Sequence, residues 1–132
     1  MDASDPIAFT TSFFPVEPGE DAPTNPGIYG RALAHWLAAE LRRRGVAAED
    51  PLAEDWGWCV TVKRRPLMVR VSCASVQGST TEWQAFAFAE RGPVQWLRRS
   101  GDPAAEVRAL RDHLAAIIPT IPGVRDIEWD HD

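Results

Sequence analysis

The sequence predicts an α+β fold in which an antiparallel sheet carries two helices on one face. Two segments have apolar residues at the three- and four-residue spacing of amphipathic helices, and three segments between them have apolar residues at alternate positions. Helices that bury one stripe against such a sheet form a two-layer sandwich, here with the order β-α-β-β-β-α-β. With 132 residues, the chain is long enough for a single domain with its own core.

The N-terminal part is expected to hold a short strand near Ile7 to Phe14, followed by a long surface loop. Residues 15–27 are rich in proline, glycine and acidic residues, which is a composition typical of loops. Thr24 or Asn25 can then cap the first helix, and Gly45 can end it in the left-handed conformation. The predicted buried stripe of this helix consists of Tyr29, Leu33, Leu37 and Leu41, with Ala32 and Trp36 beside them.

The second helix has equally clear boundaries. Asp102 can cap it, Pro103 suits its first turn, and Pro119 ends it. A short final strand is expected near residues 124–129. The predicted buried stripe of the second helix consists of Val107, Leu110, Leu114, Ile117 and Ile118.

The three strands between the helices can be paired in one register that brings their apolar residues together. A four-residue loop pairs Val62 with Leu67, and a two-residue turn at Gly78-Ser79 pairs Val71 with Phe86. A shift of one residue would turn the apolar set of a strand to the opposite face. The predicted core of the sheet consists of Trp58, Val60, Val62, Leu67, Val69, Val71, Phe86 and Phe88.

The sheet face that points away from the helices is predicted to be unusual for a surface exposed to water. Small and weakly polar residues dominate it where long polar side chains would be expected. It would also carry Arg70 and Trp83, and these two residue types often dominate binding interfaces. We therefore expect a partner or dimer surface there, unless the N-terminal strand, the loop at 15–27 or the final strand covers it.

The stretch EDWGWCVTV opens the first of these strands with two tryptophans. Gly57 lies between them and leaves space for the close approach of another segment. In one interpretation Trp56 and Trp58 are both buried, and Glu54 or Asp55 accepts a hydrogen bond from an indole N–H. In the other, Trp56 lines the mouth of a pocket and the two carboxylates lie at that mouth.

The net charge of −5 is concentrated in acidic segments at 17–21, 49–55 and 126–132. Binding to nucleic acid without sequence preference requires a broad basic surface, so we expect no nucleic-acid partner. Acidic segments would instead steer association with a basic protein partner.

The remaining features exclude several classes of protein. No apolar run approaches the ~20 residues that span a membrane, and the N-terminus lacks the basic segment of a secretory signal, so we expect a cytoplasmic protein without membrane association. No cofactor or metal site is predicted, because His35 and His113 are isolated. Cys59 and Cys73 would lie on opposite faces of adjacent strands, which disfavours a disulfide.

The segments NPGIYGRALAHWLAAELRRRG and EDWGWCVTV resemble a pattern of small bacterial proteins of unassigned function. In size, acidity and tryptophan content, the chain is also similar to immunity proteins that neutralise bacterial toxins and to small acidic chaperones of secretion systems. The chaperones usually begin with a helix, whereas this sequence predicts a strand. These resemblances imply a protein-binding function and transfer no functional residue.

We therefore expect a non-enzymatic protein-binding module, either an immunity-like inhibitor or a small acidic chaperone. No catalytic residue is predicted. The candidate binding residues are Glu54, Asp55, Trp56, Arg70 and Trp83.

Two alternatives remain open at this stage. One is a homodimer in which the open sheet of each copy faces the other. The second is a small-molecule-binding domain or modest enzyme, with a pocket between the first helix and the edge of the EDWGW strand. The candidate residues of that pocket are Tyr29, His35, Asp55 and Trp56.

Overall fold

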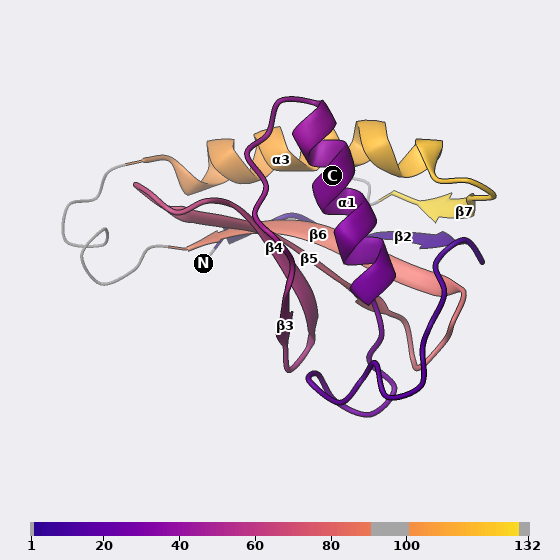
Figure 1. The fold of residues 1–132 in the computed structure, drawn as a ribbon. Coiled ribbons are helices and arrows are strands. Elements are labelled where there is room, and N and C mark those ends of the chain that lie inside the picture. Colours follow the sequence, from indigo (N-terminus) through magenta and orange to yellow (C-terminus); the bar gives the residue numbers. More distant parts are fainter. Residues whose placement is uncertain (1, 91–100, 130–132) are drawn as a thin grey trace.

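The computed structural model describes residues 2–90 and 101–129, and these residues confirm the predicted α+β architecture. Both helices lie on the same face of one antiparallel sheet (Figure 1). Residues 130–132, the end of the third acidic segment, lie outside the described residues. The elements are β1 (Asp2–Ala3), β2 (Ile7–Thr10), α1 (Arg31–Arg43), β3 (Leu52–Glu54), β4 (Gly57–Lys63), β5 (Met68–Ser75), β6 (Glu82–Glu90), α3 (Pro103–Ile117), the 3₁₀ turn η1 (Ile118–Thr120) and β7 (Arg125–Glu128).

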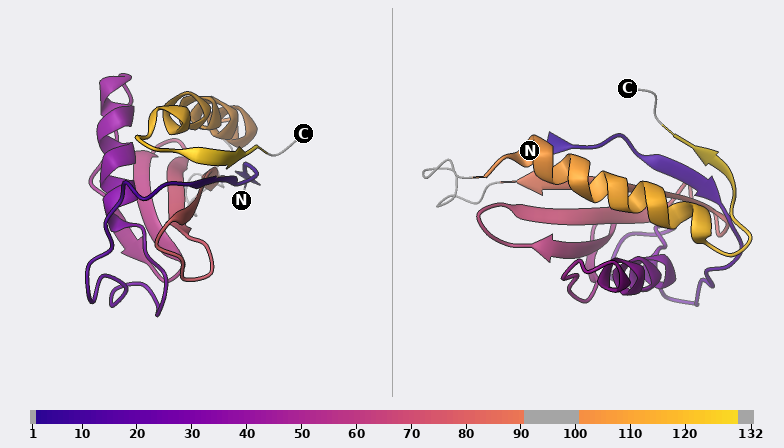
Figure 2. Two further views of the ribbon diagram at one scale, coloured as in Figure 1. Left: turned by 90° about the vertical axis from the view of Figure 1, so that its right-hand side faces the viewer. Right: turned by 90° about the horizontal axis from the view of Figure 1, so that it is seen from above.

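The strand order across the sheet is β3-β4-β5-β6-β2-β7, and β1 pairs with β6 on the same side as β2. The first and last parts of the chain therefore lie side by side at one edge, as the two views of Figure 2 show. Because β2 and β7 extend the sheet within its own plane, they do not lie across the face opposite the helices. The sequence did not predict β1 or β3.

Helix α1 begins later than the sequence predicts, at Arg31. Its first turn is capped by Glu20 from the preceding loop, because Oε2 of Glu20 accepts hydrogen bonds from the backbone N–H groups of Gly30 (3.0 Å) and Arg31 (3.2 Å). Thr24 and Asn25 do not cap the helix. They bond to backbone carbonyls of the loop and of the turn between β3 and β4.

The other predicted helix boundaries are confirmed. Gly45 follows α1 with a φ of +87°, the left-handed conformation that ends many helices. Asp102 caps α3, since its side chain accepts a hydrogen bond from the N–H of Ala105 at 3.2 Å. The helix residues buried against the sheet are Leu33, Ala34, Leu37, Ala38 and Leu41 of α1 and Val107, Leu110, Leu114 and Ile117 of α3.

The pairing of β4 with β5 is shifted by two residues from the predicted register. Val60 pairs with Val71 and Trp58 with Cys73, and a bulge follows Thr61. A shift of two residues preserves the face of every side chain. Trp58, Val60 and Val71 therefore lie in the core as predicted.

The pairing of β5 with β6 differs from the prediction by a single residue, and this reverses the faces of β6. Val71 pairs with Ala87 instead of Phe86. The connection between β5 and β6 is longer than the predicted two-residue turn. The N–H of Val76 donates a hydrogen bond to the carbonyl of Glu82, and the residues between these two form the loop. Phe86 and Phe88 are therefore absent from the core cluster beneath the helices, contrary to the prediction.

Small side chains explain why this register is the stable one. The β6 residues that lie beneath α3 are three fully buried alanines, namely Ala85, Ala87 and Ala89. They allow the helix to approach the sheet closely, so that Leu110 and Leu114 fill the space between the layers. Two phenylalanines in the same positions would require a wider gap between helix and sheet.

Candidate functional site

The sheet face opposite the helices holds the candidate site, and we call it the open face. Residues that pair across neighbouring strands point to the same side, so the register decides which side chains lie there. The open face carries Cys59 and Thr61 of β4, Met68, Arg70 and Ser72 of β5, and Gln84, Phe86, Phe88 and Glu90 of β6.

Trp56 reaches the open face from the tight turn that joins β3 to β4. Glu54 pairs with Gly57, so Asp55 and Trp56 form the two-residue turn. The indole N–H of Trp56 donates a hydrogen bond to Oγ of Ser72 at 3.1 Å, while the side chain stays 49% exposed. The ring is thus held in a defined orientation although half of it contacts solvent.

Gly57 makes this turn possible. Its φ is +151°, and a Cβ at this position would lie 2.6 Å from the carbonyl oxygen of Cys73. The close approach expected at Gly57 is therefore made by the backbone of β5. Any larger residue would push the turn, and Trp56 with it, away from the sheet.

A pocket of about 310 Å³ opens on this face, lined by Trp56, Phe86, Phe88 and Glu90. Phe86 and Phe88 are two residues apart on β6, with ring centroids 6.0 Å apart. The part of the pocket wall that the structure describes is thus mainly aromatic, with one carboxylate, that of Glu90. None of the ion pairs among the described residues involves Glu90.

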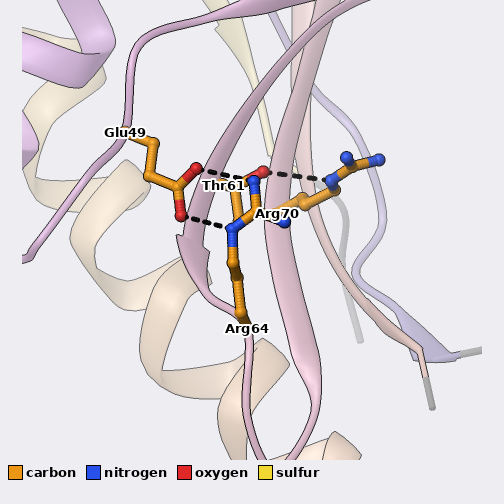
Figure 3. A network of polar contacts seen from close by, with 4 residues as sticks. All are labelled: Glu49, Thr61, Arg64 and Arg70. Carbon is orange, nitrogen blue, oxygen red and sulfur yellow. Dashed lines mark hydrogen bonds and ion pairs between the residues drawn. The ribbon is translucent and has the colours of Figure 1, made fainter. Parts of the chain in front are cut away.

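A polar network borders the pocket on the side of β4. Arg70 donates from Nε to Oγ1 of Thr61 at 3.1 Å, and its Nη1 lies 3.7 Å from Oε1 of Glu54. Figure 3 shows Arg70 beside Thr61, together with a two-bond ion pair between Arg64 and Glu49 at 2.7 Å per bond. The hydrogen bonds from Arg64 lower the pKa of Glu49. Arg70 therefore already has partners within the chain.

The two cysteines lie on opposite faces, as expected, and both are buried free thiols. Burial raises the pKa of Cys59 to about 11 and also raises that of Cys73. The carboxylates of Glu54 and Glu90 both contribute to the shift at Cys59, while Arg70 opposes it. Cys59 thus remains a neutral thiol near pH 7, a poor state for a nucleophile.

The structure brings three of the five predicted site residues together, namely Glu54, Trp56 and Arg70. Asp55 occupies the same turn with an exposed side chain. Trp83 does not belong to this surface: it is 1% exposed, lies in the core, and donates its indole N–H to the carbonyl of Thr11 at 3.1 Å. The one-residue difference in register moves Trp83 to the helix side.

The two tryptophans of the stretch EDWGWCVTV thus have different environments. Trp58 is buried, as the first interpretation expected, and Trp56 lines a pocket, as the second expected. The indole N–H of Trp58 has no hydrogen-bond acceptor among the described residues, so the expected bond to Glu54 or Asp55 is not formed. Of the residues predicted to line a pocket beside the first helix, Trp56 lies on the open face. His35 lines a separate depression, with Glu20 and Arg31, on the helix side of the sheet.

Sequence reasoning missed Phe86, Phe88 and Glu90. The only signal in the sequence was the alternation of alanine with aromatic residues along β6. Because both sets of residues are apolar, this pattern does not tell which face of the strand is buried beneath the helices. A further depression at the junction of β2, β6 and β7 adds Glu82 and Glu128. The open face therefore carries acidic residues over much of its width.

Within the described ranges, no three His, Cys, Asp or Glu side chains are grouped closely enough to hold a metal ion. Neither described helix has the length and hydropathy needed to cross a membrane. Comparison of the chain with protein-family models, curated proteins and solved structures finds no match. The function is therefore inferred from the geometry of the open face.

Proposed function

We propose that this chain is a non-enzymatic, cytoplasmic protein-binding module that engages its partner through the open face. The observation that carries the proposal is the apolar pocket formed by Trp56, Phe86 and Phe88 on the side of the sheet opposite the helices. Trp56 is half-exposed and Phe86 is partly exposed, whereas Phe88 is buried at the base of the pocket wall. Exposed aromatic residues next to a pocket are typical anchors of protein interfaces.

The neighbouring residues extend this surface beyond the pocket. Leu52 of β3 is 47% exposed, close to the 49% of Trp56, and lies at the edge of the sheet. Arg70 is held beneath this surface by Thr61 and Glu54, so its position is fixed before any partner binds. A surface that is already ordered loses less conformational entropy on binding.

The acidity of the open face favours a different protein as the partner over a second copy of this chain. Among the described residues, this face carries the carboxylates of Glu54, Glu82, Glu90 and Glu128 but only two guanidinium groups, those of Arg70 and Arg125. Two copies joined through this face would bring carboxylates together, which opposes association. An immunity-like inhibitor of a basic protein, or a small acidic chaperone, would both use such a surface.

Affinity capture followed by calorimetry tests the proposal. The wild-type chain and a Phe13→Ala variant should retain one protein partner, and Trp56→Ala should lose it. Phe13 is a matched control because it is 46% exposed but packs beside Phe14 on the helix side. With the purified partner, Trp56→Ala should weaken binding by about 2 kcal/mol, or about thirtyfold in Kd. Equal capture by all three baits would contradict the proposal.

A small-molecule-binding domain is the second candidate, and the pocket volume favours it. About 310 Å³ lies at the lower end of the range for small-molecule sites. An apolar metabolite that binds wild type, fails to bind Trp56→Ala, and leaves no protein captured by either bait would support this candidate over the first.

A further inference from the structure

We propose that the pocket formed by Trp56, Phe86, Phe88 and Glu90 receives an arginine side chain of the protein partner. The inference rests on the proposed function and names the chemical group that this site recognises. The described residues of the pocket wall supply three aromatic rings and one carboxylate. A side chain with an apolar stem and a cationic end would match both the aromatic rings and the carboxylate.

The aromatic wall supplies the first part of the recognition. A cation over the face of a tryptophan or phenylalanine is attracted by the negative face of the ring, and tryptophan is the strongest of these partners. Ser72 accepts the indole N–H of Trp56 at 3.1 Å, which fixes the ring against the sheet. The methylene stem of an arginine would cover the partly exposed ring of Phe86, which lies 6.0 Å from the buried ring of Phe88.

The carboxylate supplies the second part. Glu90 belongs to the pocket wall, is partly buried, and takes part in none of the ion pairs of residues 2–90 and 101–129. The nearby Arg70 is engaged by Glu54 and Thr61. Among the residues that the structure describes, the pocket wall therefore has one carboxylate without a cationic partner, and a guanidinium from a protein partner would neutralise it.

The surroundings favour a cation carried by a protein over a free small molecule. Acidic residues continue across the open face to Glu82 and Glu128, well beyond the pocket, and Leu52 is exposed at its other side. Arginine is favoured over lysine because the planar guanidinium stacks on aromatic rings and bonds a carboxylate through two N–H groups. Arginine is also enriched at the centre of protein interfaces.

Titration of the full chain with Nα-acetyl-arginine amide tests the inference without the partner. The neutral isostere Nα-acetyl-citrulline amide is the comparison, and the indole N–H resonance of Trp56, assigned with Trp56→Phe, is the signal. We expect saturable shifts with the arginine compound at millimolar concentration and at least fivefold weaker binding of the citrulline compound. Raising the salt concentration should weaken the arginine response.

Two variants locate the binding group. Glu90→Gln should lower arginine binding to the level of citrulline, whereas Glu128→Gln, a carboxylate of the same face outside the pocket, should leave it within twofold of wild type. Equal binding of the two compounds to wild type, or an unchanged response of Glu90→Gln, would overturn the inference.

The outcome is separable from that of the proposed function. Loss of partner capture by Trp56→Ala together with equal arginine and citrulline binding would overturn the arginine pocket and leave the protein-binding module intact. Selective arginine binding together with capture that is independent of Trp56 would support the pocket and contradict the proposed docking face.

Discussion

Replacing Gly57 with alanine perturbs the turn that holds Trp56 on the open face. The added Cβ would lie 2.6 Å from the carbonyl oxygen of Cys73 and 2.9 Å from the Cβ of Ala74. The closer atom belongs to the backbone of β5, between β4 and β6 in the sheet, so it cannot rotate away as a flexible side chain would. The φ of +151° adds strain for any residue with a Cβ.

The expected cost has two parts. The unfavourable backbone conformation contributes about 1–3 kcal/mol, and the steric overlap with β5 contributes about 1–3 kcal/mol more. Gly45→Ala is the matched control: its φ is +87°, but no atom lies within 4 Å of the added Cβ. Gly45→Ala should therefore lose only the free energy that the unfavourable backbone conformation costs, about 1–2 kcal/mol. We expect Gly57→Ala to be less stable than Gly45→Ala by about 2 kcal/mol.

Equilibrium unfolding in urea, followed by tryptophan fluorescence, measures this difference. A gap of about 2 kcal/mol corresponds to a midpoint about 1 M lower for Gly57→Ala than for Gly45→Ala. The folded variant should also show a shifted indole resonance for Trp56, because the turn must move to relieve the overlap. If Gly57→Ala is no less stable than Gly45→Ala, β5 does not limit the space at this turn and the reasoning is refuted.

Three further predictions concern the core, the buried thiol and the helix cap. Trp83→Phe loses a buried hydrogen bond and should cost about 1–3 kcal/mol, against less than about 1 kcal/mol for half-exposed Trp56→Phe; equal costs in urea unfolding would contradict the burial of Trp83. Burial raises the pKa of Cys59 to about 11, so between pH 9 and 11 the unfolded chain loses this proton first and the free energy of unfolding should fall, by on the order of 1 kcal/mol per pH unit. Cys59→Ala should reduce that slope in unfolding measured across this range. Glu20→Ala removes the cap of α1 and should lower stability by about 1 kcal/mol in the same assay, whereas exposed Glu17→Ala should change it by less than about 0.5 kcal/mol.

Features determined by neighbouring residues were predictable from the sequence. The end of α1 at Gly45 and the start of α3 at Asp102 depend on residues within one turn of the boundary. The start of α1 was not predictable in the same way, because its cap comes from Glu20, which lies eleven residues before Arg31 and reaches it only once the loop has folded back.

The candidate site was predicted in part for a similar reason. Trp56 and Glu54 were identified because the stretch around them is unusual in composition, and Arg70 because its face was assigned correctly. Trp83 was assigned to the wrong face, and Phe86 with it, because alanine and aromatic residues alternate along β6 and both sets are apolar. The choice between them depends on how closely α3 approaches the sheet, which no local pattern encodes.

The pairing of β2 also constrains the order in which the protein can be assembled during synthesis. All partners of β2 lie late in the chain: Ile7 pairs with Ala85 of β6, and Ala8 pairs with Glu128 of β7. At 5–20 residues per second, β6 is translated roughly 4–16 s after β2. During that interval the nascent N-terminal segment carries Ile7 and Phe9, both buried in the finished protein, without the strands that will cover them. The N-terminal arm must therefore join the sheet after the central hairpins have left the ribosome, and until then its apolar residues stay without their native partners.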